Sequence, residues 1–238
     1  MPNTWFRFRQ FIVHQDKTAM KVGTDSVLLG AWCEPAGCKS ILDIGTGTGI
    51  LALMLAQRSE ALIDAIDSDL QAAEQAAGNF ALSPWKDRLK AEHIDFEGLL
   101  AQNRPKYGLV VCNPPYFRDS LRPPSHGRSM ARHTETLQAG ELIKGTASLL
   151  SENGHFCLVF PAEDEGRMKE ISAANRLFPS RILRVRPVPS KNFSRVLMDL
   201  SFKEANATES ELLVEAGGRH SYSPEYLELT KEYYPERK

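Results

Sequence analysis

The segment Asn113-Pro114-Pro115-Tyr116 contains the residues whose types and spacing are best suited to chemistry. Its two prolines end the preceding apolar run and stiffen the loop, although a simple strand-ending turn is the alternative interpretation. The side-chain oxygen of Asn113 and the carbonyl oxygen of Pro114 can accept the two N–H bonds of a conjugated, poorly nucleophilic amine. These bonds favour a pyramidal nitrogen whose lone pair points at an electrophile. Because Tyr116 adds a flat stacking face, the segment predicts a site that activates an amino group, with all four residues as catalytic candidates.

The glycine-rich segment 42–49, Leu-Asp-Ile-Gly-Thr-Gly-Thr-Gly, follows a predicted strand and precedes a predicted helix. Glycines at alternate positions allow a tight turn and a close approach of a ligand to the backbone. The G-x-G-x-G spacing differs from the G-x-G-x-x-G of dinucleotide enzymes, which hold a pyrophosphate at the helix N-terminus. Asp43 would place a carboxylate near that position and disfavour phosphate. A ligand with an ammonium and a sulfonium group suits the loop better, which indicates S-adenosylmethionine held by Asp43, Gly45, Thr46 and Gly47.

Acidic residues end the next two predicted strands. Asp67 lies eighteen residues after Gly49, where an acidic side chain binds ribose hydroxyls in nucleotide-binding α/β folds. We therefore expect Asp67 and Ser68 to contact the cofactor. Asp95 can accept a hydrogen bond from an adenine amine, and Phe96 offers an apolar face to the ring, with a simple turn or helix-start residue as the alternative interpretation of Asp95. Lys21 is a further candidate for the cofactor pocket, with a surface position as the alternative.

Strand-like and helix-like segments alternate through the middle of the chain, which predicts a parallel sheet with helices on both faces. The predicted parallel strands are Ser40–Ile44, Leu62–Ile66, Leu89–Ile94, Gly108–Cys112 and Gly154–Phe160. The predicted helices are Ile50–Arg58, Asp69–Leu82, Thr136–Leu149 and Glu163–Asn175. After Pro179 the segments Arg181–Val188 and Arg195–Phe202 have no helix between them. They predict an antiparallel pair that closes one edge of a seven-stranded sheet.

The two ends of the chain are expected to extend one domain, residues 1–238, rather than to form others. Residues 1–34 are an N-terminal extension and a helix, with Thr24 as N-cap, Asp25 in the first turn and an end at Trp32 or Cys33. Residues 206–238 contain a strand-like piece, Glu211–Glu215, and a tyrosine-rich helical piece.

The composition excludes several classes of protein. With 42% apolar and 25% charged residues among 238, the chain is neither wholly disordered nor collagen-like. Its apolar runs are too short for a transmembrane helix, and its N-terminus lacks the layout of a signal peptide. We therefore expect a cytoplasmic protein with no obligate protein partner. The four cysteines show no metal-binding spacing, so we predict neither a metal nor a disulfide.

Basic residues are clustered although the net charge is only −1. Residues 171–198 include six basic side chains and no acidic one, and four arginines against one aspartate follow the Asn113 segment. Such clusters are typical of phosphate contact, with plain solvated surface as the alternative.

The motifs together resemble a known family. The glycine loop and its acidic partner resemble the Rossmann-like class I methyltransferases that use S-adenosylmethionine, and the Asn-Pro-Pro-Tyr segment is similar to that of enzymes methylating amino groups. Residues 8–17, 19–32, 131–137 and 222–230 closely resemble the bacterial tRNA1(Val) (adenine-37-N6)-methyltransferases. This resemblance implies tRNA as partner and N6 of adenine as target. It also makes Arg118, Arg122, Arg128 and Arg132 candidate RNA contacts.

One departure and several alternatives stay open. The family often ends in an aromatic pair followed by an apolar residue, whereas Pro235 follows Tyr233-Tyr234 here, which leaves the docking of the tail open. N-methylation of a protein glutamine or of another RNA base keeps the same chemistry. A vestigial RNA-binding protein is the non-enzymatic alternative, and the glycine spacing disfavours a dinucleotide oxidoreductase.

Overall fold

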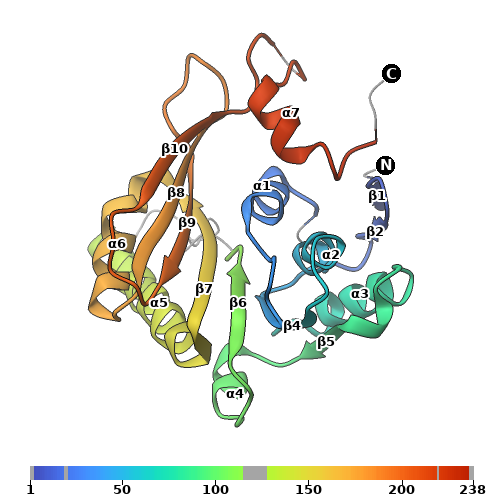
Figure 1. Cartoon of the computed structure of the whole chain (residues 1–238), viewed down its shortest axis with the longest axis horizontal. Coiled ribbons are helices and arrows are strands. Elements are labelled where there is room, and N and C mark those ends of the chain that lie inside the picture. The colour runs from blue at the N-terminus through green and yellow to red at the C-terminus, as the bar shows by residue number, and fades with distance from the viewer. Residues whose placement is uncertain (1–2, 19–20, 115–127, 219, 236–238) are drawn as a thin grey trace.

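The structure is a computed structural model that describes residues 3–18, 21–114, 128–218 and 220–235, with only the backbone described for 128–138. Its centre is an eight-stranded sheet in the order β10-β8-β9-β7-β6-β3-β4-β5 (Figure 1). The strands are β3 (Ser40–Ile44), β4 (Leu62–Asp67), β5 (Leu89–His93), β6 (Tyr107–Cys112), β7 (Leu150–Pro161), β8 (Phe178–Arg186), β9 (Arg195–Ser201) and β10 (Thr208–Leu213). Only β9 runs antiparallel to its neighbours in this sheet. The predicted α/β class and mostly parallel sheet are confirmed.

We predicted that an antiparallel pair closes one edge of a seven-stranded sheet, and this prediction is wrong by one strand. The antiparallel pair of β8 and β9 forms as predicted, but β10 pairs in parallel with β8 and takes the edge position. The predicted piece Glu211–Glu215 is therefore a true strand, three residues earlier at its start. An edge strand has one solvated side, and the first four residues of β10 are exposed, so its hydrophobic pattern is weak.

Helices cover both faces of the sheet, as predicted. The helices are α1 (Thr24–Trp32), α2 (Ile50–Gln57), α3 (Leu70–Ala81), α4 (Phe96–Leu100), α5 (Arg128–Leu149), α6 (Glu165–Ala174) and α7 (Pro224–Thr230). Alternate strand residues divide the core into two clusters. Ile41 and its face pack with α1, α2, α3 and α7, whereas Leu42 and its face pack with α4, α5 and α6. Among the described residues, no helix is long and apolar enough to cross a membrane.

Helix α1 begins one residue away from the predicted N-cap. Gly23, in extended conformation, is the N-cap, and Thr24 is the first helical residue. Asp25 lies in the first turn, as predicted. Its carboxylate Oδ2 accepts a hydrogen bond from Arg195 of β9 at 2.9 Å. The helix end that follows Gly23 is thus fixed to the sheet through a side chain 170 residues further along the chain.

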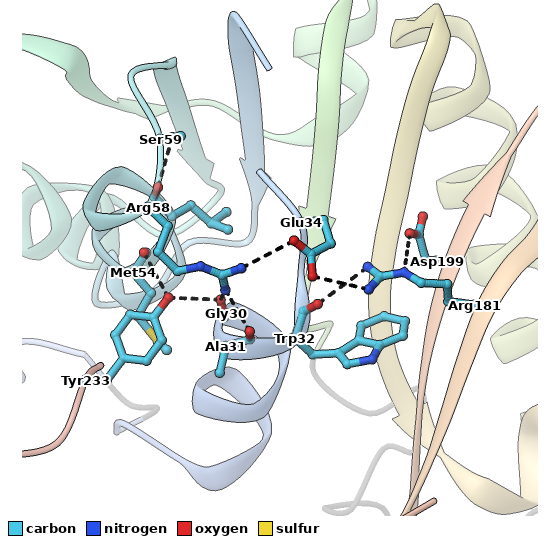
Figure 2. Close-up of polar contacts among 11 residues, drawn as sticks. Gly30, Ala31, Trp32, Glu34, Met54, Arg58, Ser59, Arg181, Asp199 and Tyr233 are labelled. Atoms are coloured by element: carbon cyan, nitrogen blue, oxygen red, sulfur yellow. Dashed lines mark hydrogen bonds and ion pairs between the residues drawn. The ribbon is translucent and has the colours of Figure 1, made fainter. Parts of the chain in front are cut away.

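The N-terminal hairpin and the C-terminal tail are docked together. Strands β1 (Trp5–Arg7) and β2 (Ile12–His14) form an antiparallel pair, and the backbone N–H of Arg9 donates to the carbonyl of Tyr233 at 2.6 Å. Tyr233 is buried, with only 1% of its surface exposed. Its hydroxyl donates to the carbonyls of Gly30 and Met54 (Figure 2). The tail therefore docks on α1 and α2 despite the departure at Pro235.

A network of charges surrounds the C-terminal end of α1 (Figure 2). Arg58 donates to the carbonyl of Ala31 at 2.7 Å, and Glu34 lies 3.6 Å from both Arg58 and Arg181. The guanidinium of Arg181 lies 4.4 Å from the centre of the Trp32 ring. Cation, carboxylate and aromatic groups thus hold this helix end on the sheet.

Candidate active site

A cavity of about 520 Å³ opens at the carboxyl ends of β3, β4 and β6. Thr18, Lys21 and residues 23–26 line it, together with the glycine loop and the start of α2, the turn after β4 with Ala72 of α3, and Asn113-Pro114 after β6. The predicted site residues that line the cavity are Lys21, Gly45, Thr46, Gly47, Asp67, Ser68, Asn113 and Pro114. The carboxyl edge of an open parallel sheet is where such folds bind ligands.

The glycine loop has the conformation that its glycines allow. Gly47 has a φ of +56°, and a Cβ at this position would meet no atom within 4 Å, so a ligand can approach the backbone. Gly49 is the N-cap of α2 at φ +80°, and a Cβ there would lie 2.5 Å from the Phe80 ring. The loop is tied to β4, because the N–H groups of Gly45 and Thr46 both donate to the carbonyl of Ile66 at 2.9 Å.

Asp43 lies beneath the loop and does not line the cavity. It is fully buried, and its Oδ2 accepts a hydrogen bond from the Thr46 hydroxyl at 2.6 Å. Its Oδ1 is buried without a hydrogen-bond partner among the described residues. Burial raises the pKa of Asp43 to about 7, although hydrogen bonding from the Thr46 hydroxyl and from the backbone of Ala52 lowers it in part. The carboxylate is therefore poorly stabilised in its charged form, and a nearby positive charge would offset this cost.

Asp67 both lines the cavity and shapes the loop above it. Its Oδ2 accepts from the backbone N–H of Gly47 at 2.8 Å, and its Oδ1 accepts from that of Asp69 at 2.9 Å. Each carboxylate oxygen can accept a second hydrogen bond, so the half-buried side chain can still receive two hydroxyls. The sequence predicted the ligand role and missed the contact with Gly47.

Asp95 and Phe96 do not line the cavity formed by the described residues. The side chain of Asp95 caps α4, accepting from the N–H of Gly98 at 2.7 Å. Phe96 packs against the core cluster that includes α5, where a Cβ on Gly145 would lie 2.6 Å from its ring. The helix-start alternative therefore describes Asp95 in this structure, and a cofactor contact by either residue stays a prediction.

Asn113 is fixed by a residue that sequence analysis missed. Its Nδ2 donates to the hydroxyl of Ser26 in the first turn of α1, at 2.7 Å. Because the amide N–H₂ points to Ser26, the carbonyl oxygen Oδ1 is the atom left to accept from a substrate amine. Asp25, from the same turn, also lines the cavity. Sequence gave no signal for Ser26, since its contact joins residues 87 positions apart.

Two buried amides of α3 position the segment that walls the cavity. Asn79 accepts from the N–H of His14 and donates to the carbonyls of His14 and Thr48, each at 2.8 Å. Gln75 accepts from the N–H of Lys17 at 2.9 Å. These bonds join β2 to the glycine loop, so the wall near Lys21 does not depend on local sequence alone.

The remaining predicted residues lie outside what the structure describes. They are Pro115, Tyr116, Arg118 and Arg122, together with the side chains of Arg128 and Arg132. In the described ranges, no cluster of three or more metal-ligating side chains is found. All four cysteines are free thiols.

Comparison with known proteins gives the class. Residues 19–171, which include the glycine loop and Asn113-Pro114, match a family model described as Methyltransferase small domain. A predicted O-methyltransferase from Agrobacterium tumefaciens superposes with a TM-score of 0.67 at 18% identity, over 88% of this chain and 96% of its own. The T. thermophilus 16S rRNA N2 G1207 methyltransferase, in complex with AdoMet and guanosine, has a TM-score of 0.54 at 19% identity, over 85% and 52%. Fold and site together define a Rossmann-like methyltransferase.

The nearer relatives define the particular family. A Bacteroides thetaiotaomicron protein named tRNA1(Val) (adenine(37)-N6)-methyltransferase is 48% identical over 236 residues, which cover 98% of each chain. The chain belongs to this methyltransferase family. The resemblance carried by the N-terminal, middle and C-terminal segments of the sequence is thereby confirmed.

Proposed function

We propose that this protein transfers the methyl group of S-adenosylmethionine to the N6 amine of adenine 37 in tRNA1(Val). The observation that carries the proposal is that Asn113-Pro114 and the glycine loop line one cavity of about 520 Å³. A cofactor in the loop and an amine at Asn113 would therefore be neighbours. The name of the 48% identical relative and the AdoMet complex of the rRNA methyltransferase support the same assignment.

The residues around the cavity fit this cofactor. S-adenosylmethionine supplies a methyl group on a positively charged sulfur, together with an ammonium group. Asp43, whose buried Oδ1 lacks a partner among the described residues, provides the negative charge that these cations need. Asp67 would accept the two ribose hydroxyls, and the open side of Gly47 would admit the ligand to the backbone. Lys21, Thr46 and Ser68 complete the proposed cofactor wall.

Activation of the amine would depend on Asn113 and Pro114. Their two oxygens accept the N6 hydrogens and aim the nitrogen lone pair at the methyl carbon. Ser26 keeps the Asn113 amide in the orientation that presents Oδ1. The cofactor would supply the methyl group and its sulfur would leave with the electrons of the C–S bond, while Asn113 and Pro114 would hold the amine nitrogen, which becomes cationic and acidic on methylation. Its proton would then leave to water without a strong general base. In the prediction from sequence, Pro115 stiffens the segment and Tyr116 offers the flat face on which the base stacks.

The testing experiment is methyl transfer from labelled S-adenosylmethionine to total bacterial tRNA that lacks this modification, followed by nucleoside analysis. We expect labelled N6-methyladenosine with the native protein and none with Asn113→Ala, whose cofactor affinity should stay within about tenfold. Asp67→Ala should instead weaken cofactor binding by about 1–3 kcal/mol, measured by calorimetry.

The outcomes separate the competing assignments. No labelled nucleoside, from protein that binds the cofactor, would contradict the proposal; label in glutamine of a protein substrate would replace tRNA with that substrate. Near-normal turnover by Asn113→Ala would remove this residue from the mechanism.

A further inference from the structure

The basic segment 171–198 contains two kinds of charge. Three of its arginines are paired with carboxylates: Arg181 with Asp199 at 3.2 Å, Arg184 with Glu165 at 2.5 Å and Glu209 at 2.8 Å, and Arg195 with Asp25 at 2.9 Å. Arg186 and Lys191 have no ion pair with any described residue. Arg176 also has no ion pair within the described chain. It precedes β8 and therefore lies at the amino ends of the parallel strands, away from the carboxyl ends where Asn113 lies.

The two unpaired cations lie on the same edge of the sheet as Asn113. Strand β8 runs in the direction of β7 and β6, so residues 187–194, the β8–β9 loop, leave the sheet at its carboxyl edge (Figure 1). Arg195, the first residue of β9 after this loop, is bound to Asp25 in the cavity wall. Three strand spacings separate the ends of β6 and β8, about 14 Å. Nucleotides that flank a base in the cavity can reach across this distance.

The guanidinium of Arg186 lies over the ring of Phe193 at this loop. The guanidinium carbon of Arg186 lies 4.5 Å from the centre of the Phe193 ring, and Nη1 donates to the carbonyl of Lys191 at 2.9 Å. A guanidinium over an aromatic ring presents N–H groups to a phosphate, and both groups are planar surfaces on which a base can stack. Lys191 itself is exposed.

The loop is held in shape before any ligand binds. The N–H of Ser194 donates to the carbonyl of Val185 at 2.9 Å, and the N–H of Lys191 donates to that of Val188 at 3.1 Å. Pro187 and Pro189 restrict the backbone further. Binding to such a loop costs little conformational entropy.

We propose that the β8–β9 loop binds the unpaired RNA strand that carries the target nucleotide. In this assignment Lys191 and Arg186 contact phosphates, and the Arg186–Phe193 pair stacks on a flanking base. The inference rests on the proposed function, because it extends that site along the sheet edge. RNA fits better than an acidic protein, since the loop combines phosphate donors with a flat stacking surface.

The test uses the full-length protein and a stem-loop RNA containing the target adenine. Lys191→Glu should weaken binding at least tenfold, and Lys191→Ala should lower the salt slope of log Kd by about one. Lys203→Glu is the matched control, because Lys203 is exposed and follows β9 at the opposite edge. It should change binding less than twofold. Equal affinities for Lys191→Glu and Lys203→Glu would overturn the proposal.

A second variant tests the stacking surface separately from charge. Phe193→Leu keeps an apolar body and removes the ring, so stem-loop binding should weaken a few-fold with an unchanged salt slope. An affinity equal to that of the native protein would remove stacking from the proposal. Failure of the two proposals is distinguishable. Absence of N6-methyladenosine from native protein contradicts the proposed reaction, whereas an unchanged KM for tRNA with Lys191→Glu in an active enzyme contradicts only the loop assignment.

Discussion

The two ends of α1 are both fixed by arginines of the sheet, yet they are built for different purposes. At the C-terminal end, Arg181, Glu34 and Arg58 form a continuous set of ion pairs above the buried Tyr233 (Figure 2). At the N-terminal end, Arg195 holds Asp25, and the neighbouring Ser26 holds Asn113 beside the cavity. A helix clamped at one end can present polar groups at the other without moving when a ligand binds.

Replacing Tyr233 should disrupt the packing at the C-terminal end of α1 and have the largest effect on stability. Burial raises the pKa of Tyr233 to about 12, so its hydroxyl stays protonated and donates to Gly30 and Met54. Tyr233→Ala leaves a cavity and should lower the free energy of unfolding by about 3–5 kcal/mol. Tyr233→Phe removes only the hydroxyl and should cost about 0.5–1.5 kcal/mol. Urea unfolding measures both, and equal losses would show that packing of the ring contributes little.

Asp43→Asn tests the cofactor site beside the N-terminal end of α1. A buried carboxylate there should favour ligand binding and lower the stability of the folded chain. The pKa of Asp43 is raised from 3.8 to about 7 by burial, so ionisation favours the unfolded chain as pH rises between these values. The variant should therefore be more stable than the native protein by about 1–3 kcal/mol above pH 7, with no gain below about pH 4.

The same substitution should weaken cofactor binding, since it removes the negative charge near the proposed sulfonium and ammonium. Thermal unfolding with and without S-adenosylmethionine measures both effects. Unchanged cofactor affinity would show that Asp43 serves the loop through Thr46 alone.

Sequence predicted the features that depend on neighbours along the chain. The glycine loop, Asp67 and the segment beginning at Asn113 were predicted directly from strand ends and turn residues. In the structure Asp67, Asn113, Pro114 and residues 45–48 of the loop line one cavity. Asp95 shows the limit of this reasoning, because an aspartate after a strand has the same local pattern whether it caps a helix or faces a ligand. β10 shows another, since its pairing with β8 depends on the sheet rather than on its own weak pattern.

Long-range contacts account for the rest. Arg184 and Arg186 are two residues apart and look alike in the sequence. Glu165 pairs with Arg184 from α6, whereas no described carboxylate pairs with Arg186. Likewise, the contact of Ser26 with Asn113 exists only because the start of α1 lies over the end of β6.

Ser26→Ala should have a smaller effect, at the N-terminal end of α1. Losing the hydrogen bond to Asn113 Nδ2 should lower kcat about tenfold, because Oδ1 is no longer held toward the amine. KM for tRNA and cofactor affinity should change little, and Ser26→Thr should restore most of the rate by keeping the hydroxyl. Steady-state kinetics measure the split. A native kcat in Ser26→Ala would mean that Asn113 is oriented by other contacts.

The smallest effect is expected at the pair of His155 and Asp199, whose carboxylate also pairs with Arg181. The ring Nδ1 lies 2.9 Å from Asp199 Oδ1, and this hydrogen bond raises the pKa of His155 above its ordinary 6.5. The pair therefore adds stability that is fully present below about pH 6.5 and is lost as pH rises through the folded pKa. Because the ring is half-exposed, the contribution should stay below about 1 kcal/mol.

Comparing the native protein with His155→Gln by urea unfolding at about pH 5.5 and 8.5 isolates this term, because other titrating groups cancel in the difference. We expect the native protein to be favoured at the lower pH, with the difference shrinking at the higher. A difference independent of pH would show that the imidazole acts as a neutral donor. Arg181, which lies 3.2 Å from the same carboxylate, would then balance the charge of Asp199 at both pH values.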